Sequence, residues 1–334
     1  MIQGEAWNIP GPSSRSLQAL NERAASLATK SRASSTKIKY WSHFVKFQRW
    51  GSSMDPPLPT LPASSHTVVL FLTDLADKGA SRAMLYGYFY GIRWVHELNG
   101  HPDPTSAPLT RLVLEGAKRN VQKIAVSKDS CSIGVLKSII TAASNDRSLR
   151  FSRFCTMAVL AFAAFLRIGE LIKLRRCDIT LHTDYIELFI PRSKRDVYAD
   201  GATVMVSKGH SETCPVDTLC RYLLRVDLLE PQENTSFIFR NLSPKNRNRL
   251  VEHNKPMLYG RAREDLLFYA KRLKLSNNLA WHSFRRGGAT AAANNGVPDR
   301  LLKKHGRWAS DGAKNRYVDE DLRSKLIVSS KLGL

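Results

Sequence analysis

Hydrophobic residues recur at helical spacing through most of the first 126 positions of the chain. Between positions 17 and 50 this spacing predicts two helices, with several apolar residues close to one face: Ile38, Trp41, Val45 and Trp50. After a proline-rich loop at 54–65, further helices are predicted over Thr67–Lys78, Ser81–Leu98 and Leu109–Gln122. The pattern therefore predicts a helical domain over residues 17–126, preceded by a Gly-, Pro- and Ser-rich disordered segment, residues 1–16.

The pattern changes after the polar sequence VQKIAVSKDSCSI, which indicates a linker with a domain boundary near residue 127. Helices are predicted over Leu136–Ala143 and Phe151–Phe165, and the second is almost wholly apolar and therefore buried. TDYIELFIPRS and ATVMVSK are rich in β-branched residues and predict a β-hairpin or a three-stranded sheet. Helical patterns return near Thr218. The expected fold class is mainly α with a small β-sheet: an α-helical N-terminal domain and an α+β domain over residues 127–334.

The composition is that of a globular protein, with 43% hydrophobic and 24% charged residues among 334. The N-terminus lacks an apolar signal core and no run of 18 apolar residues occurs, so neither secretion nor membrane spanning is expected. The cysteines form no CxxC pair and no zinc-type cluster: Cys131, Cys155, Cys177, Cys214 and Cys220. Reduced thiols in an intracellular protein, without metal or cofactor, fit this distribution.

The net charge of +22 favours a polyanion as partner, in preference to a merely basic soluble protein. Residues 1–126 carry 15 basic and 8 acidic side chains, and residues 127–334 carry 36 and 21, so both parts can contact phosphates. Residues 237–274 hold ten basic side chains, which are expected largely to face DNA phosphates or, alternatively, solvent. The residues predicted to contact DNA are Lys37, Lys39, Arg82, Arg93, Arg247, Arg249, Arg261 and His305.

The clearest motif joins two segments, FLRIGELIKL at 165–174 and WHSFRRGGATAAANNGVPDRLLKKHGRWASDGAKNRYV at 281–318. They contain an arginine in a Leu-Arg-x-Gly-Glu-Leu setting, then His-x-x-Arg, then a tryptophan and a tyrosine. Trp308 follows Arg285 by 23 positions, and Tyr317 follows Trp308 by nine. This order and spacing resemble the tyrosine recombinase or phage integrase family, over about residues 30–330.

The resemblance implies a helical, SAM-like core-binding domain at 17–126, which binds DNA, and a catalytic domain at 127–334. It implies six catalytic residues: Arg167, Lys194, His282, Arg285, Trp308 and Tyr317. Tyr317 would be the nucleophile, and Lys194, in the turn after a strand, the general acid. His305 also precedes Tyr317 in a glycine-containing turn, but the spacing favours Trp308. Glu170, inside the first motif, is expected to play a structural hydrogen-bonding role.

Phosphodiester transfer requires side chains of these types. A tyrosine hydroxyl has a pKa near 10, so it attacks well only if a neighbour removes its proton or stabilises its phenolate. Arg167 and Arg285 can each present a planar fork to the scissile phosphate, whose charge grows in the transition state. His282 can act as a base or hydrogen-bond partner, and Trp308 as an indole N–H donor. Taken singly, each residue has an ordinary structural interpretation, and only the joint order favours catalysis.

The resemblance implies a recombinase that forms a 3′-phosphotyrosyl intermediate and acts as a tetramer on two double-stranded DNA sites. Two alternatives remain open: a type IB topoisomerase with the same chemistry, and a domesticated DNA-binding protein that no longer cleaves. The wording HSFRRGGAT with GRW and Tyr-Val is most similar to recombinases of eukaryotic mobile elements, such as DIRS-like retrotransposons and Cryptons. The expected location is the nucleus in a eukaryote, and otherwise the cytoplasm or nucleoid.

Overall fold

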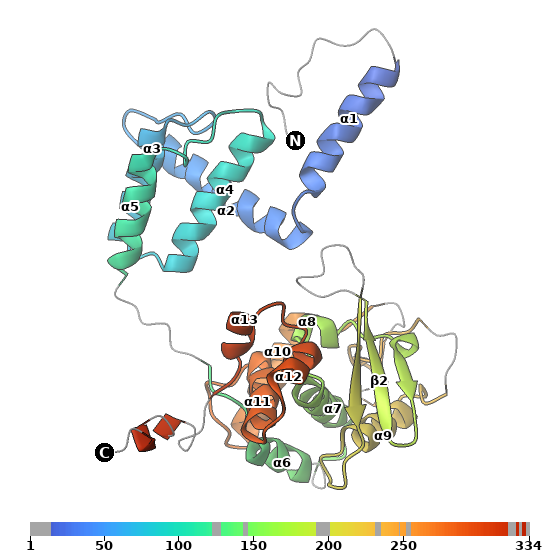
Figure 1. Cartoon of the computed structure of the whole chain (residues 1–334). Helices are drawn as coiled ribbons and strands as arrows, with labels where there is room; N and C mark the ends of the chain where they lie inside the picture. The colour runs from blue at the N-terminus through green and yellow to red at the C-terminus, as the bar shows by residue number, and fades with distance from the viewer. Residues whose placement is uncertain are drawn as a thin grey trace. The chain divides into compact units, whose positions relative to one another are not determined.

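The computed structural model of the chain describes residues 15–121, 128–142, 146–191, 201–230, 235–246, 248–251, 255–319, 325–326 and 329–331. The chain divides into two compact units, Met1–Val126 and Ser127–Leu334 (Figure 1). The domain boundary predicted from the sequence also lies near residue 127. Lys194 and Arg247, together with most of the segment predicted to be disordered, lie outside the described residues. The DNA-binding and catalytic roles of the two units stay predictions.

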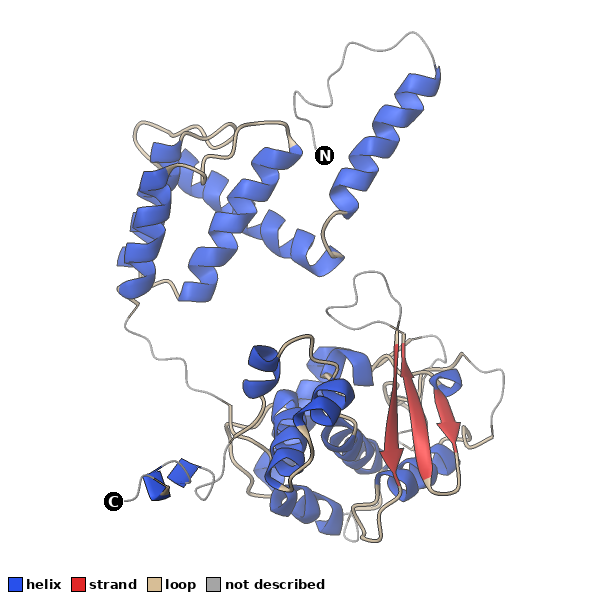
Figure 2. Ribbon diagram, in the orientation of Figure 1, coloured by secondary structure: helices blue, strands red, loops and turns tan. Residues whose placement is uncertain are grey.

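The described part of the first unit consists of helices joined by loops (Figure 2). Its helices are α1 (Arg15–Lys30), α2 (Ser34–Ser52), α3 (Ser65–Asp77), α4 (Arg82–Leu98) and α5 (Pro108–Arg119). Helix α1 begins at Arg15, two residues before the start at residue 17 that the sequence predicts, and a difference of about one to two residues is usual at helix ends. Helices α2 and α4 pack closely because α4 has Gly87 and Gly91 opposite His43 and Tyr40 of α2.

The apolar stripe proposed for α2 from the sequence is wrong in part. Ile38 and Trp41 are 72% and 43% exposed, whereas the buried side chains of the helix are those of Phe44 and Phe47. Phe47 packs against Phe71 of α3, with ring centroids 4.9 Å apart. The face that carries Phe44 and Phe47 is buried because it meets α3 and α4, whereas helical spacing alone cannot tell which of two apolar stripes finds a partner.

The second unit combines helices with one small sheet. Its helices are α6 (Ile133–Thr141), α7 (Leu149–Ala163), α8 (Ile168–Leu171), α9 (Pro215–Arg225), α10 (Tyr259–Arg272), α11 (Trp281–Asn294), α12 (Asp299–Gly306) and α13 (Asp311–Asn315), with a 3-10 turn at Arg176–Asp178. The strands β1 (Ile179–Leu181), β2 (Tyr185–Ile190) and β3 (Ala202–Ser207) form an antiparallel sheet in the order β1-β2-β3. The predicted fold class, mainly α with a small sheet, is confirmed.

Helix α7 forms the centre of the second unit. Eleven of its side chains are buried, as its apolar run predicts. It packs against α9 and α11, and the sheet lies to one side of these helices (Figure 2). At its end the chain reverses through Phe165, whose φ of 47° is in the left-handed region, and enters α8. The end of the buried helix therefore brings Arg167 beside α11 and α12.

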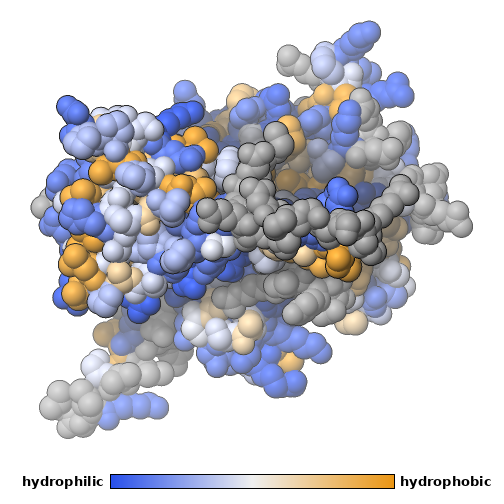
Figure 3. Space-filling view, turned by 90° about the horizontal axis from the view of Figure 1, so that it is seen from above, coloured by the Kyte–Doolittle hydropathy of each residue, from blue (hydrophilic) through white to orange (hydrophobic). Residues whose placement is uncertain are grey.

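Burial corrects part of the charge prediction. Arg240 is 4% exposed, and its carbonyl accepts a hydrogen bond from Arg153, so this residue of the basic stretch does not face solvent. By contrast Arg249, Arg261 and Lys271 are exposed. Hydrophilic residues cover much of the visible surface, with hydrophobic residues in separate patches between them (Figure 3). No described helix is long and apolar enough to cross a membrane.

The cysteines behave as ordinary core residues where they are buried. All five are free thiols, and Cys131, Cys155 and Cys214 are buried. Burial raises the pKa of Cys131 to about 12, and chiefly burial raises the pKa of Cys155 to about 12 as well. The thiols of Cys131 and Cys155 are therefore not ready nucleophiles at neutral pH.

Helix α11 approaches its neighbours closely because two consecutive glycines face them. A Cβ at Gly287 would overlap the carbonyl oxygen of Cys131, and one at Gly288 would overlap that of Phe162 at the end of α7. Both obstacles are backbone atoms, which cannot move aside as a flexible side chain can. The glycines thus allow α11 to lie against the end of α7.

We predict that Gly287→Ala lowers the free energy of unfolding of the second unit by about 1–3 kcal/mol or more, because the added methyl forces a backbone shift. Gly260→Ala on α10 is the matched control: nothing lies within 4 Å of its Cβ, so the change should be neutral or stabilise by up to about 1 kcal/mol. Denaturant unfolding of both variants measures the difference. Equal stabilities would contradict the close packing of α11.

Candidate active site

Arg167 stands at the turn between the buried helix α7 and the short helix α8. It is the N-cap of α8, and its backbone N–H donates to Glu170 Oε2 at 2.9 Å. Its guanidinium donates to Glu170 Oε1 at 2.7 Å, while its side chain stays 19% exposed. Glu170 therefore plays the structural hydrogen-bonding role expected of it and leaves part of the Arg167 guanidinium accessible.

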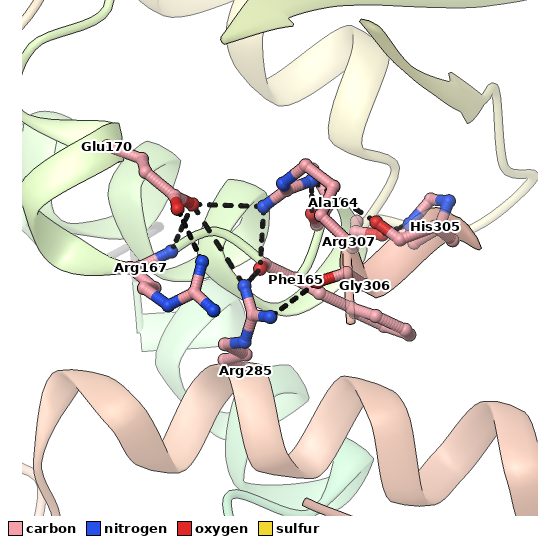
Figure 4. A network of polar contacts seen from close by, with 9 residues as sticks. Ala164, Phe165, Arg167, Glu170, Arg285, His305, Gly306 and Arg307 are labelled. Atoms are coloured by element: carbon pink, nitrogen blue, oxygen red, sulfur yellow. Dashed lines mark hydrogen bonds and ion pairs between the residues drawn. The ribbon is translucent and has the colours of Figure 1, made fainter. Parts of the chain in front are cut away.

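Arg285 comes from the middle of α11 and is fully buried, at 0% exposure. Its Nη1 donates to the Phe165 carbonyl and its Nη2 to the Gly306 carbonyl at 2.5 Å. Two carbonyl acceptors from separate turns hold the guanidinium in one place (Figure 4). The helical His-x-x-Arg spacing puts His282 one turn earlier, on the exposed side of α11.

Arg307 is a member of this cluster that the sequence analysis missed. It ends α12 in the left-handed conformation, with φ 55° and ψ 44°, which is uncommon for a residue other than glycine. Its Nη2 donates to Glu170 Oε2 at 2.9 Å and to the Phe165 carbonyl at 3.1 Å (Figure 4). It thereby joins the turn before Arg167 to the turn before Trp308. The one sequence feature that could have indicated a role for Arg307 is its position in the Gly-Arg-Trp sequence at the end of a helix.

One carboxylate faces three guanidinium groups in this cluster. Glu170 lies 2.7 Å from Arg167, 2.9 Å from Arg307 and 4.0 Å from Arg285. Among the described residues it is the single carboxylate within ion-pair distance of them, which leaves the cluster with two excess positive charges. Burial alone would raise the pKa of Glu170, but Arg307 and Arg167 outweigh burial, and the pKa is lowered. Burial, followed by the charges of Arg167 and Arg307, lowers the pKa of Arg285 to about 9.

Trp308 and Tyr317 meet over the Arg285 guanidinium. The guanidinium carbon lies 5.0 Å from each ring centroid, and the two rings lie 5.2 Å apart. Both pack with Phe165, Ala289 and Leu302 in a small cluster of their own. Trp308 is 6% exposed, and its Nε1 is buried without a hydrogen-bond partner among the described residues. The aromatic rings thus hold the tyrosine beside the arginine cluster.

The structure brings together five of the six residues predicted to be catalytic. His282 completes the group, because its ring lies 4.8 Å from that of Tyr317. Arg285 links the others, because it lies beside Trp308 and Tyr317 and shares Glu170 with Arg167. Lys194 lies outside the described residues, between β2 and β3. The catalytic roles themselves stay predictions, since geometry alone does not test them.

Of the described residues predicted to contact DNA, His305, Arg93 and Arg82 make contacts within the protein. His305 is half-buried: its Nε2 lies 2.9 Å from the Ala163 carbonyl, and burial lowers its pKa. Arg93 is paired with Glu97 at 2.7 Å, and Arg82 donates to the Lys118 carbonyl at 2.9 Å. The remaining described members, half-buried or exposed, are Lys37, Lys39, Arg249 and Arg261.

The arrangement has the properties of an anion site beside a tyrosine. The excess positive charge is buried, where water cannot screen it, so an anion with several acceptor oxygens would bind strongly. Among the described residues, no group of three or more His, Cys, Asp and Glu side chains is placed to hold a metal ion. A phosphodiester, with two non-bridging oxygens, fits donors that are fixed before it arrives.

Comparisons with known proteins agree with this geometry. Residues 134–323 match the phage integrase family. The integrase/recombinase xerD homolog of Selenomonas ruminantium is 23% identical over 314 residues, which cover 90% of this chain and 86% of that protein. The XerH site-specific recombinase bound to palindromic difH substrate shares the fold, with a TM-score of 0.59 at 15% identity over 88% of this chain and 77% of that chain. A lambda integrase dimer bound to a COC′ core site has a TM-score of 0.54 at 16% identity over 89% and 75%.

The protein is an enzyme of the class that breaks and rejoins DNA strands. The family match spans more than half of the chain. The chain therefore belongs to the phage integrase family, the tyrosine recombinases, which cleave and rejoin DNA through a tyrosine intermediate.

We predict that Glu170→Gln destabilises the second unit by about 3–5 kcal/mol at pH 7, because it leaves buried guanidinium groups without their counter-charge. The Glu170 pKa in the folded protein lies below its ordinary value of 4.5, so its ionisation contributes stability above about pH 4.5 and loses it as the pH falls further. The difference between wild type and variant should therefore shrink below pH 4.5. Denaturant unfolding at several pH values measures it.

Glu264→Gln is the matched control, since Glu264 pairs with Arg261 at 2.7 Å but both side chains are more than half exposed. This change should cost less than about 1 kcal/mol at any pH. A Glu170→Gln effect no larger than that of the control would contradict the role of Glu170 as counter-charge.

Proposed function

We propose that the protein is a site-specific recombinase in which Tyr317 attacks a DNA phosphodiester held by Arg167 and Arg285. The bond from phosphorus to the 5′-oxygen breaks as the bond from phosphorus to the tyrosine oxygen forms. The products are a 3′-phosphotyrosyl link and a free 5′-hydroxyl. The reverse step, with the 5′-hydroxyl of another strand as nucleophile, restores the phosphodiester. The bond energy is retained in the link, so rejoining needs no nucleotide triphosphate.

The observation that carries this proposal is the uncompensated positive charge next to Tyr317. Three guanidinium groups share one carboxylate, and the ring of Tyr317 lies 5.0 Å from the Arg285 guanidinium. A bound phosphate would supply the missing negative charge. Its oxygens would also satisfy the buried Trp308 Nε1, which has no partner among the described residues.

The remaining residues have the proton-transfer roles. His282 is next to the Tyr317 ring and is proposed to accept the phenolic proton, directly or through the phosphate. Lys194 is proposed to protonate the leaving 5′-oxygen, and rests on the sequence resemblance alone. Both transfers leave the number of protons on protein and DNA unchanged over the full cycle of cleavage and rejoining.

We further propose that a tetramer acts on two DNA duplexes, with double-stranded DNA as partner. The XerH and lambda integrase structures named above were solved with DNA, and the latter as a dimer.

The motif HSFRRGGAT supports assignment to the recombinases of eukaryotic mobile elements, in which case the site of action is the nucleus. Exchange between two plasmids supports a recombinase, whereas relaxation of supercoils without exchange would support a topoisomerase.

The first test is covalent capture. Nicked duplex oligonucleotides release a short fragment on cleavage, so the protein should accumulate as an SDS-stable adduct with DNA attached at Tyr317, located by mass spectrometry. Tyr317→Phe should form no adduct and still bind DNA, because only the nucleophilic hydroxyl is lost. Tyr259→Phe, at an exposed tyrosine of α10, is the control and should react as the wild type does. An adduct that persists in Tyr317→Phe would refute the assignment.

The second test concerns the phosphate clamp. Arg167→Lys keeps the charge but loses the planar fork, and should lower the rate of adduct formation by roughly 10²–10³ at saturating DNA. Arg225→Lys, an exposed arginine of α9, is the control and should leave the rate unchanged. Rates are measured in single turnover on the same nicked duplex. A rate close to that of the wild type in Arg167→Lys would remove this residue from the clamp.

A further inference from the structure

The segment that carries Tyr317 is fastened to α12 on its N-terminal side. Lys314 Nζ lies 2.5 Å from Asp299 Oδ2, and the Lys314 side chain is 5% exposed. A second pair joins the start of α13 to α12, with Lys303 Nζ 3.2 Å from Asp311 Oδ1. These contacts hold α13, but they end three residues before the tyrosine. They do not determine where its ring points.

On the C-terminal side the segment meets a single stripe of α11. His282, Arg286 and Thr290 are four residues apart and so lie on one face of that helix. The His282 ring is 4.8 Å from the Tyr317 ring, and the Arg286 guanidinium donates to the Asp319 carboxylate. The same helix that supplies Arg285 to the phosphate site thus presents a separate row of side chains to the tyrosine segment.

Thr290 contacts the backbone of the tyrosine segment directly. Its hydroxyl donates to the Tyr317 carbonyl at 3.2 Å and accepts from the Asp319 N–H at 3.0 Å. These two groups flank Val318, so one side chain holds the chain on both sides of that residue. A threonine hydroxyl has one proton to donate, and here it goes to the tyrosine segment.

Two other helical threonines use that proton within their own helix. Thr73 and Thr156 donate to the carbonyl four residues earlier, at 3.0 and 2.9 Å. This local bond is the usual choice for a threonine inside a helix. Thr290 instead bonds to residues 27 and 29 positions away in the sequence, which indicates a contact between segments rather than a contribution to the helix.

We propose that Thr290 and Arg286 are positioning residues, a clasp that sets the place of the Tyr317 hydroxyl relative to the phosphate. This inference rests on the proposed function of Tyr317. The Arg286–Asp319 pair is partly exposed, with side chains 26% and 40% accessible, so salt weakens it. Thr290 is the more important half, because its bonds fix the tyrosine backbone itself. A displacement of about 1 Å in the nucleophile is enough to slow such a reaction up to 10²-fold.

Thr290→Val tests the clasp, because valine keeps the shape of threonine and removes both hydrogen bonds. We expect the single-turnover rate of adduct formation on a nicked duplex to fall about 10- to 100-fold at saturating DNA, with DNA affinity unchanged. Thr290→Ser restores the hydroxyl and should restore most of the rate. Thr156→Val is the matched control: it removes a helical hydroxyl of α7 that bonds only within its helix, and should leave the rate unchanged.

A structural role would lower the melting temperature and leave the rate of the folded enzyme unaltered, so both are measured. A Thr290→Val rate equal to that of the wild type, or a Thr290→Ser rate as low as that of Thr290→Val, would overturn the proposal. Failure of the wild type to form any adduct would instead overturn the proposed function, so the two failures are distinguishable.

A second measurement does not depend on catalysis. With 3-fluorotyrosine incorporated, the fluorine resonance that disappears in Tyr317→Phe reports the position of this ring. In Thr290→Val we expect this resonance to shift or broaden as the segment leaves α11, and in Thr156→Val to stay in place. A resonance that is the same in wild type and Thr290→Val would show that the clasp does not hold the tyrosine, and would overturn the proposal.

Discussion

The carbonyl of Phe165 is the point on which the rest of the site depends. It accepts hydrogen bonds from Arg285 in α11 and from Arg307 at the end of α12, which lie 120 and 142 residues further along the chain. A buried guanidinium is costly unless its donors find partners, and Glu170 with the carbonyls of Phe165 and Gly306 supplies partners for the terminal nitrogens of both arginines. The left-handed turn at Phe165 is what presents the carbonyl in the right direction. The end of α7, helix α11 and the end of α12 therefore meet because their polar groups satisfy one another.

This construction leaves positive charge in excess beside Tyr317. The carbonyls of Phe165 and Gly306 orient Arg285 but carry only partial charge, and Glu170 neutralises one of three guanidinium groups. The two excess charges remain inside a low-dielectric environment. Donors arranged before the substrate arrives need no reorganisation during the reaction, which is the main electrostatic contribution of such sites to catalysis. The packing of α7 and its neighbours offsets the unfavourable free energy of burying these guanidinium groups together.

The tyrosine is held by contacts of two kinds. Its ring packs on Trp308 and over the Arg285 guanidinium, and these contacts keep it beside the arginine cluster without fixing its distance from the other guanidinium groups. Directional bonds through Thr290 then act on its backbone. Nondirectional packing and directional hydrogen bonds thus have separate tasks, and both involve α11. Gly287 and Gly288 let α11 approach the backbone of Cys131 and of Phe162 in α7. This close packing places α11 where it can make both kinds of contact with the tyrosine segment.

The fold class, the buried character of α7, the paired strands β2 and β3 and the motif could all be predicted from the sequence, because they follow from local periodicity and spacing. It did not find Arg307 or Thr290, since an arginine in a left-handed turn and a threonine inside a helix have no local signature of their tasks. It also did not distinguish the buried Arg240 from the exposed members of the basic stretch, or the exposed Ile38 and Trp41 from the buried residues of α2. These points depended on three-dimensional packing, because burial and long-range hydrogen bonds are set by which segments meet, and the local sequence of a segment does not specify which segments it packs against.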